Sequence, residues 1–262
     1  MRYLFCINAG RSGSNYLAEL LATAQGVAAF HEAEPTMHGA PLRQVSAAPL
    51  ASSYSERQVK LGGVARLLAE RPWAHTYAET NHMFIKTFFD VVVDSLREVE
   101  VMHLRRDPVR VLKSFVELGY FSPLNHVWPD WMSTHDAATA AFYGLGDPRD
   151  QYDRCIGYFY DIEARATRFR RAYPRIPVHD VALEDVLEPA GALTLFERLR
   201  LTATARTAEV VGRVVNDRAS VKERISNPSD LAECRRRLSQ YAGRVGALGI
   251  EVPLPLRIRY SD

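Results

Sequence analysis

The sequence predicts an α/β fold of three layers, in which a mainly parallel central sheet is flanked by helices on both faces. Short apolar runs alternate along the chain with segments whose apolar residues recur at helical spacing, and this alternation is typical of βαβ units. The first run, residues 3–7, is apolar at every position, as expected of a strand that is buried on both faces of a sheet. A parallel sheet with helices on both sides accounts for both observations.

The expected elements follow one another in strand–helix order. Strands are expected at residues 3–7, 27–31, 75–80, 98–104 and 176–183, and helices at residues 16–22, 57–71, 85–97, 108–118 and 152–173. Gly26 follows the first helix and Pro72 follows the second, and both residue types end helices. Pro108 suits the first turn of the fourth helix. Beyond the last strand the chain is expected to be mostly helical to about residue 249, with residues 227–229 starting the final helix.

Two segments have weak periodicity and are expected to be loops. Residues 34–55 hold prolines among serines and alanines. Residues 119–150 are rich in aromatic residues, histidine, proline and aspartate, and a connection of that length is usually a lid or a binding loop. Trp128 and Trp131 in this segment suit stacking on an apolar or sugar ligand, and they equally suit packing of the loop against the body. No linker divides the chain, so we expect a single domain over residues 1–262.

The composition is that of an ordinary globular protein and excludes a disordered, collagen-like or coiled-coil chain, since 47% of the 262 residues are hydrophobic and 24% are charged. The 33 basic residues nearly balance the 31 acidic ones, and the net charge of +2 gives no signature of nucleic-acid binding. No stretch approaches the roughly 18–20 apolar residues of a membrane span. The three scattered cysteines show no metal-ligand spacing and, without a secretory signal, favour a cytoplasmic location.

The turn after the first strand has the pattern of an anion-binding loop. Residues 8–15 read Asn-Ala-Gly-Arg-Ser-Gly-Ser-Asn and lead directly into a helix. In such a turn the backbone N–H groups converge at the positive end of the helix dipole, and Gly10 lets the backbone approach a phosphate closely. The side chains of the turn add hydrogen-bond donors and a positive charge. The residues expected to bind the anion are Arg11, Ser12, Gly13, Ser14 and Asn15.

The same turn admits two other interpretations. It is compatible with a tight strand-to-helix connection in which a serine caps the helix. It is also compatible with a phosphate loop of a kinase or ATPase, although the Gly-Lys-Ser/Thr triplet of a Walker A loop is absent. The cation precedes the second glycine instead of following it, which argues against a magnesium–nucleotide enzyme.

A second cationic element follows the strand at residues 98–104. Residues 105–115 read Arg-Arg-Asp-Pro-Val-Arg-Val-Leu-Lys-Ser-Phe, with Arg106 at the exit of the strand and Ser114 about two helical turns further on. Because ligands bind beyond the carboxyl ends of parallel strands, we expect this exit to lie beside the first turn. Arg106 and Ser114 then bind a second anion. The alternative is an ordinary helix start with Asp107 near the N-terminus.

Together the two elements resemble the paired signatures of the sulfotransferase family that uses 3′-phosphoadenosine 5′-phosphosulfate (PAPS). Residues 10–14 resemble the family's 5′-phosphosulfate loop, in which the bacterial, carbohydrate-type and tyrosylprotein-type branches carry arginine. Arg106 and Ser114 resemble the pair that binds the 3′-phosphate, and the order and spacing of the two motifs agree with the family. The run up to Leu183-Glu184-Asp185 is similar to bacterial members.

The resemblance implies a P-loop NTPase-like sulfotransferase fold and in-line transfer of a sulfuryl group from PAPS to a hydroxyl or amine, without a metal. The implied acceptor is a small molecule, a glycan or a lipid, and residues 119–150 are then a lid or acceptor-binding loop. Arg11 and the amides of residues 12–15 would stabilise the charge that develops during transfer. Two alternatives stay open: a P-loop kinase with a degenerate phosphate loop, and a non-catalytic protein that binds adenosine 3′,5′-bisphosphate.

The resemblance also implies a general base that takes the acceptor's proton. Glu32 follows the strand at residues 27–31 and stands 21 residues after Arg11, which matches the catalytic glutamate of the tyrosylprotein and trehalose-type branches. Glu79 and His82 are the alternatives, although the Lys-Thr-His triplet that marks the catalytic histidine of the cytosolic branch is absent. Glu32 is therefore the predicted base.

Related proteins close the 3′-phosphate site from their C-terminal part. The run from Asn216, Asp217 and Arg218 through Lys222 is the candidate for this role here, with a solvated helix face as the alternative. The family's Arg-Lys-Gly triplet is missing from this region.

Overall fold

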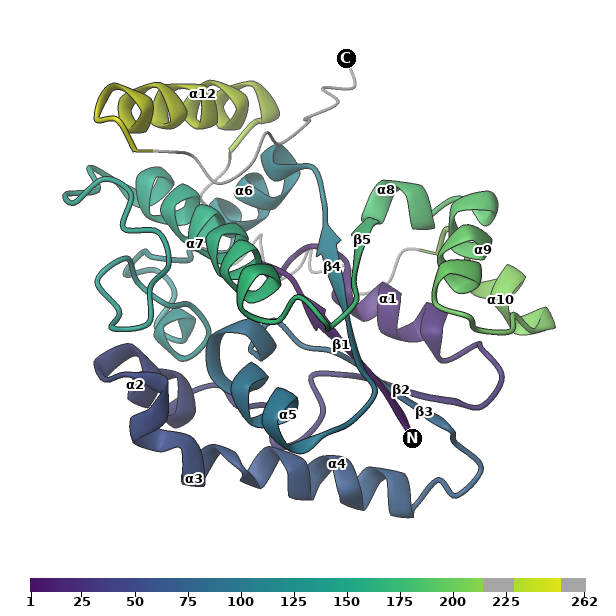
Figure 1. The fold of residues 1–262 in the computed structure, drawn as a ribbon. Coiled ribbons are helices and arrows are strands. Elements are labelled where there is room, and N and C mark those ends of the chain that lie inside the picture. Colours follow the sequence, from purple (N-terminus) through teal and green to yellow (C-terminus); the bar gives the residue numbers. More distant parts are fainter. Residues whose placement is uncertain (214–228, 251–262) are drawn as a thin grey trace.

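A parallel sheet lies at the centre of the fold in the computed structural model, which describes residues 1–213 and 229–250 (Figure 1). Within these residues, five strands form one sheet in the order β2-β3-β1-β4-β5, and every pair of neighbours is parallel. The strands are β1 (Arg2–Ile7), β2 (Val27–His31), β3 (Thr76–Thr80), β4 (Val99–Arg105) and β5 (Val178–Ala182). The predicted parallel sheet is thereby confirmed.

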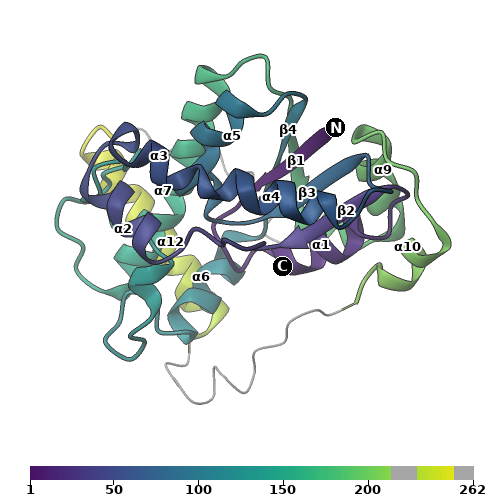
Figure 2. The ribbon, with the colours of Figure 1, turned by 90° about the horizontal axis from the view of Figure 1, so that it is seen from below.

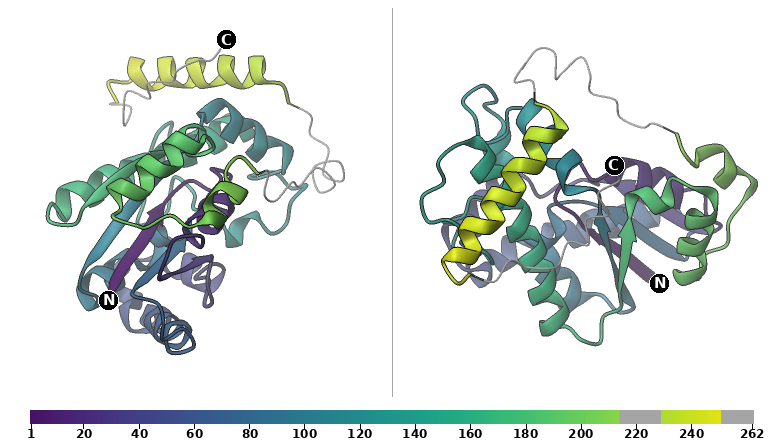
Figure 3. Two further views of the ribbon diagram at one scale, coloured as in Figure 1. Left: turned by 90° about the vertical axis from the view of Figure 1, so that its right-hand side faces the viewer. Right: turned by 90° about the horizontal axis from the view of Figure 1, so that it is seen from above.

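Helices connect the strands and surround the sheet (Figure 1). The longer helices are α1 (Ser14–Leu21), α2 (Ala40–Ala47), α4 (Val59–Ala69), α5 (Phe89–Ser95), α6 (Pro108–Glu117), α7 (Gln151–Ala172), α9 (Pro189–Arg198), α10 (Ala205–Val210) and α12 (Leu231–Ala247). Shorter ones are η1 (Leu50–Ser53), α3 (Tyr54–Arg57), η2 (Phe84–Phe88), η3 (Trp128–Asp130) and α8 (Leu183–Val186). Helix α12 lies across α6 and α7 on the outside of the molecule (Figure 3).

The two faces of the sheet carry separate hydrophobic layers. In β1, Phe5 and Ile7 belong to one layer, whereas Leu4 and Cys6 belong to the other, as the alternation of side chains along a strand requires. Helices α2, α4, α5, α6, α7 and α12 contribute to the first layer, and α1, α9 and α10 contribute to the second. Figure 2 shows α1, α9 and α10 grouped on one side of the strands. The predicted three-layer α/β architecture is therefore confirmed.

One predicted loop is wrong, because residues 34–55 include helix α2 and the short helix η1. Pro41 lies in the first turn of α2, after Gly39, whose φ is 67°. Proline at that position starts a helix instead of breaking it, since its missing N–H has no helical partner there in any case. Leu42 and Val45 then anchor α2 in the core. The other elements agree with the prediction to within a few residues, which is the usual uncertainty of helix and strand ends.

The strand order brings four loops to one edge of the sheet. From β1 the chain passes outward to β2, returns through β3 and then crosses to β4 on the other side of β1. Ile7 of β1 pairs with His103 of β4, and His31 of β2 pairs with Thr80 of β3. The segments that follow these strands therefore leave the sheet at its carboxyl edge, where parallel α/β folds bind ligands.

The C-terminal candidates Asn216, Arg218 and Lys222 lie outside the described residues, as do residues 227–228 at the expected start of the last helix. The single domain over residues 1–262 stays a prediction for the same reason.

Candidate functional site

The turn after β1 has the main-chain geometry of an anion-binding nest. Gly10, Arg11 and Gly13 have φ angles of 80°, 55° and 86°, and left-handed residues in a turn direct successive N–H groups toward one side. The N–H of Gly10 donates to Oδ1 of Asn8 over 2.9 Å, which fixes the exit from β1. A Cβ at Gly13 would lie 2.5 Å from Cδ1 of Leu183, so both space and backbone conformation require glycine there.

The start of helix α1 continues this turn. Ser12 donates its hydroxyl to the carbonyl of Gly10 over 3.1 Å, and the hydroxyl of Thr80 donates to the carbonyl of Ser14 over 2.7 Å. Strand β3 thus holds the first residue of α1 in place. The first turn of α1 contains no acidic residue, so nothing within that turn offsets the positive end of the helix dipole. The five predicted residues 11–15 are therefore arranged around the N-terminus of one helix, where the dipole would favour an anion.

The structure joins the two predicted anion-binding motifs directly. Nε of Arg11 donates to the hydroxyl oxygen of Ser114 over 3.1 Å. Nη1 of Arg106 donates to the carbonyl oxygen of Arg11 over 3.1 Å. Motifs that lie 95 residues apart in the sequence therefore meet at the carboxyl ends of β1 and β4. We call residues 10–15, Arg106 and Ser114 together the cradle.

Helix α6 carries Ser114, and the connection between β4 and α6 carries Arg106. The carboxylate of Asp107 caps the helix by accepting the N–H of Val109, and Pro108 occupies its first turn. Ser114, two turns further on, is buried against the turn after β1. Burial lowers the pKa of Arg106, and the carboxylate of Glu184 opposes this effect, so the guanidinium stays charged at neutral pH.

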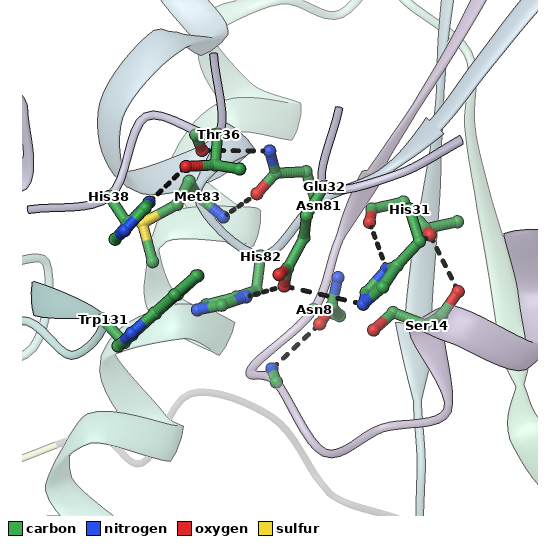
Figure 4. Close-up of polar contacts among 12 residues, drawn as sticks. Asn8, Ser14, His31, Glu32, Thr36, His38, Asn81, His82, Met83 and Trp131 are labelled. Carbon is green, nitrogen blue, oxygen red and sulfur yellow. Dashed lines mark hydrogen bonds and ion pairs between the residues drawn. The ribbon is translucent and has the colours of Figure 1, made fainter. Parts of the chain in front are cut away.

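Glu32 and His82 form a hydrogen-bonded pair beside the cradle (Figure 4). Nδ1 of His82 lies 2.8 Å from Oε1 of Glu32, and Nε2 of His31 lies 3.8 Å from the same oxygen. A Cβ at Gly10 would lie 3.9 Å from the ring carbons Cγ and Cδ2 of His82, so the imidazole packs over the turn after β1. Glu32 itself has a φ of 49°, a backbone conformation that is rare outside glycine and is often found at functional sites.

At neutral pH the pair consists of a charged carboxylate and a neutral imidazole. Burial raises the pKa of Glu32, but the hydrogen bond from His82 and the attraction of nearby basic groups outweigh it and lower this pKa to about 2. Burial, together with Lys86, lowers the pKa of His82 to about 4 against the attraction of Glu32. Because a carboxylate only accepts hydrogen bonds, Nδ1 of His82 carries the proton and Nε2 keeps a lone pair. The pair therefore offers an oxygen and a nitrogen that can accept a proton.

Glu79, the other carboxylate considered as a base, has a different environment. It is fully buried, and its oxygens accept hydrogen bonds from Nζ of Lys60 over 2.6 Å, the hydroxyl of Tyr77 over 2.7 Å and Nδ2 of Asn81 over 2.9 Å. Three donors thus hydrogen-bond to the carboxylate of Glu79 in the protein interior. The geometry therefore favours Glu32 and His82 over Glu79 as proton acceptors.

The fold is similar to that of two solved sulfotransferase domains. One comes from the olefin synthase of Synechococcus PCC 7002, with a TM-score of 0.53 and 14% identity over 92% of this chain and 94% of that domain. The other comes from the curacin biosynthetic pathway, with a TM-score of 0.50 and 14% identity over 96% of this chain and 99% of that domain. No protein-family model and no curated protein sequence matches the chain. The chain has a sulfotransferase fold.

In this sulfotransferase fold an aromatic wall stands against the Glu32–His82 pair. The indole of Trp131 stacks on the imidazole of His38 with ring centres 4.1 Å apart, and on that of His82 with ring centres 5.6 Å apart (Figure 4). We call His38 and Trp131 the aromatic wall. Its two residues come from the segments that the sequence analysis interpreted as loops, residues 34–55 and 119–150.

A cavity of about 300 Å³ lies between residues 119–150, α7 and α12. Trp128 lines it and packs on Phe121 with ring centres 4.6 Å apart, so the two tryptophans of the segment face different surroundings. Tyr158 lines the same cavity, and its hydroxyl accepts a hydrogen bond from Nζ of Lys86 over 3.0 Å. The segment is thus anchored to the body through aromatic packing, while Trp131 contacts the candidate catalytic pair.

The described residues contain neither a candidate metal site nor a candidate membrane-spanning helix. Residues 1–213 and 229–250 bring together no group of three or more His, Cys, Asp or Glu side chains that could bind a metal ion. In the same ranges, no helix has the length and apolar character that crossing a membrane requires.

Several residues of the site escaped the sequence analysis. Asn8 and Thr80 hold the turn after β1 and the start of α1, but each looks like an ordinary polar residue at the end of a strand. An asparagine directly after a buried strand is a signal for a side-chain-capped turn and could have identified Asn8. His38 and Lys86 carry no such signal, because their contacts with Trp131 join segments far apart in the sequence.

Proposed function

We propose that the protein transfers a sulfuryl group from PAPS to a hydroxyl or amine of a small-molecule, glycan or lipid acceptor. The observation that supports this most strongly is the direct contact of Arg11 with Ser114 and of Arg106 with the main chain of Arg11. It creates one site with two adjacent groups of anion-binding residues. The sulfotransferase fold supports the same proposal.

The cradle suits the two anionic ends of PAPS. The donor molecule supplies an activated sulfuryl group on its 5′-phosphate and, unlike ATP, a 3′-phosphate. The amides of residues 12–15 and the side chain of Arg11 bind the 5′ end, where a glycine-rich turn allows close approach. Arg106 and Ser114 bind the 3′-phosphate, for which a guanidinium and a hydroxyl are suitable donors.

Arg11 and the loop amides have a second role in this mechanism. Negative charge grows on the oxygen that leaves the sulfur, and hydrogen-bond donors aimed at that position stabilise the transition state more than the ground state. These donors are held by the rest of the turn before any ligand binds, since Asn8 and Thr80 fix its two ends. Arg11 is therefore both a binding and a catalytic residue in this proposal.

The Glu32–His82 pair accepts the acceptor's proton. Glu32 remains the proposed catalytic carboxylate, and His82 shares the task because its Nε2 has a free lone pair when Nδ1–H is donated to Glu32. Two variants locate the accepting atom. If the proton goes to Glu32, Glu32→Gln loses more activity than His82→Gln; if it goes to His82 and Glu32 stabilises the imidazolium, the order is reversed.

The acceptor hydroxyl or amine binds against both the sulfuryl group at the 5′ end of PAPS and the Glu32–His82 pair, because it bonds to the sulfur while the pair takes its proton. We propose residues 119–150 as the lid or acceptor-binding loop, because Trp131 of this segment contacts His82. We also propose a cytoplasmic location, which the three buried, unpaired cysteines support: Cys6, Cys155 and Cys234.

Thermal unfolding with three nucleotides tests the proposal. Adenosine 3′,5′-bisphosphate at about 100 times its Kd should stabilise the protein by about 2.7 kcal/mol relative to the free protein. ADP or magnesium ATP at the same concentration should stabilise it less. In Ser114→Ala this preference should shrink. Equal or stronger stabilisation by magnesium ATP would support a kinase instead. Stabilisation by the bisphosphate with no transfer from labelled PAPS to any class of acceptor would support a non-catalytic binding protein.

A further inference from the structure

Lys86 is a buried lysine whose hydrogen bonds join three elements behind the aromatic wall. It lies on the short helix η2 and is fully buried. Its Nζ donates to the main-chain oxygen of Trp131 over 2.5 Å and to the hydroxyl of Tyr158 over 3.0 Å. It also lies 5.2 Å from the centre of the Tyr158 ring. One amine on η2 therefore contacts both the segment that carries Trp131 and helix α7.

A comparison with the other fully buried lysine shows what is unusual about Lys86. Lys60 is equally buried, but its Nζ forms an ion pair with Glu79. Among the described residues, Lys86 has no carboxylate within ion-pair distance. Burial lowers the pKa of Lys86 well below its usual value, with Arg165 lowering it further and the carboxylates of Glu32 and Asp161 opposing this.

The stabilising effect of Lys86 thus lies in its two hydrogen bonds. An apolar side chain of similar size would fill the same space without the free-energy cost of burying an amine. What the amine adds is a hydrogen-bond donor for the main-chain carbonyl of Trp131, in a contact that is partly buried. This contact fixes the main chain at the residue whose indole stacks on His82.

We propose that Lys86 is a positioning residue, which holds the main chain of Trp131 so that the indole stays stacked against the Glu32–His82 pair. Its effect on turnover rests on the proposed function, whereas its effect on the Trp131–His82 contact does not. Lys86 touches neither the cradle nor the proposed acceptor. It holds the indole through the main chain of Trp131, and its charge separately lowers the pKa of His82. Removing its amine should therefore release the indole and leave binding of adenosine 3′,5′-bisphosphate unchanged.

The variant Lys86→Met tests the proposal, because methionine has a similar length and is well accepted in a buried site. The readout is the nuclear magnetic resonance of the His82 ring protons, which a stacked indole displaces from their usual positions. The variant Trp131→Leu defines how much of that displacement the indole causes. Lys86→Met should lose most of the same displacement. Tyr158→Phe, which removes the other hydrogen bond of Lys86 and leaves Trp131 in place, should keep it.

The double variant separates the effect on the indole from the direct effect of Lys86 on the pKa of His82, because the resonances are recorded at neutral pH, where the imidazole is uncharged. If Lys86 acts through Trp131, adding Lys86→Met to Trp131→Leu changes the His82 resonances no further, because coupled residues are not additive. With PAPS and an acceptor, kcat of Lys86→Met should fall about tenfold to a hundredfold, the effect of a misplaced reacting group. Wild-type His82 resonances in Lys86→Met would overturn the proposal, as would full additivity in the double variant. Absence of any sulfuryl transfer in the wild type would instead contradict the proposed function and leave the resonance test valid.

Discussion

The two sides of the site are built differently. The cradle consists largely of main-chain groups and of two arginine–serine motifs that come after β1 and β4. The other side, the Glu32–His82 pair and the aromatic wall, depends on side-chain contacts among separate segments. In the cradle, the glycines and the start of helix α1 set the direction of the backbone N–H groups, so the local sequence alone determines their arrangement. On the other side, Glu32, His82 and the aromatic wall keep their arrangement only while their neighbours hold them. The cradle should therefore tolerate changes at the wall, and each side should be separable by mutation.

The largest expected effect separates transfer from nucleotide binding. Glu32→Gln keeps the size of the side chain and an oxygen that accepts the Nδ1–H of His82, but it removes the negative charge. Loss of general-base assistance should lower kcat by about a hundredfold to ten-thousandfold. The Kd of adenosine 3′,5′-bisphosphate, measured by calorimetry, should change by less than about threefold, because Glu32 contacts His82 and His31 and is not one of the proposed nucleotide-binding residues.

If Glu32→Gln weakened binding of adenosine 3′,5′-bisphosphate as much as it slowed transfer, the two sides of the site would not be separable by mutation. A fall in kcat of less than about tenfold would contradict the role of Glu32 as a catalytic residue. Glu79→Gln is not a matched control, since Glu79 accepts three buried hydrogen bonds and its replacement disturbs the interior.

The second prediction concerns a variant that changes the cradle alone. Arg106→Ala removes the guanidinium that contacts the main chain of Arg11 and is proposed to bind the 3′-phosphate. A charge-assisted hydrogen bond contributes about 1.5–3 kcal/mol, so the affinity for adenosine 3′,5′-bisphosphate should fall about tenfold to a hundredfold. The affinity for adenosine 5′-monophosphate, which has no 3′-phosphate, should change little.

An equal loss of affinity for both nucleotides would mean that Arg106 acts only by holding Arg11. The resonances of His82 provide the complementary control: they should match the wild type, because the imidazole packs on Gly10 and on Trp131 and not on Arg106.

The fold and the cradle were predictable because both depend on local signals. A strand buried on both faces is a continuous apolar run, as residues 3–7 are, and a helix near it is marked by spacing and by glycine or proline at its ends. The turn of the cradle follows from glycines, serines and an arginine within eight residues, and Arg106 and Ser114 follow from a second motif after the strand at residues 98–104. The same local logic failed at residues 34–55, where prolines that usually interrupt structure instead start α2 and η1.

The aromatic wall was not predictable, because no spacing connects its members. His38 and Trp131 come from two separate segments, and Lys86, which holds Trp131, comes from a third; only the fold brings them together. Lys86 looks like a solvated residue of an expected helix, and nothing in the sequence indicates that its amine is buried. Trp131 was identified as a candidate, but stacking on a ligand and packing against the body were indistinguishable until the contact with His82 was known.

The third prediction tests whether the backbone conformation of the cradle requires glycine at residue 13. Gly13→Ala introduces a Cβ at a φ of 86° and within 2.5 Å of Leu183. The left-handed conformation and the crowding together should lower the free energy of unfolding by about 2–3 kcal/mol. Gly62→Ala is the matched control, because a Cβ at Gly62 meets no atom within 4 Å and the residue lies in helix α4. This control should be neutral or stabilising by up to about 1 kcal/mol, as chemical denaturation would reveal.

The smallest expected effect is the pH dependence of stability that the Glu32–His82 pair produces. The pKa of His82 is lowered to about 4 in the folded protein by burial and by Lys86, against about 6.5 in the unfolded chain. Between these values the unfolded chain binds a proton that the folded protein does not, so stability decreases as the pH falls from about 6.5 toward 4. The pKa of Glu32, lowered to about 2, extends the same loss to more acidic pH, because the unfolded carboxyl takes up its proton first.

Urea unfolding at pH 7 and pH 5 measures the contribution of His82. His82→Gln should reduce the difference in unfolding free energy between the two pH values by about 1–2 kcal/mol relative to the wild type, since only the wild type has this group to protonate. Arg106→Ala, on the cradle side, should keep the wild-type difference. An unchanged pH dependence in His82→Gln would mean that His82 has its ordinary pKa in the folded protein, and that the imidazole beside Glu32 is less buried than its contacts with Gly10 and Trp131 require.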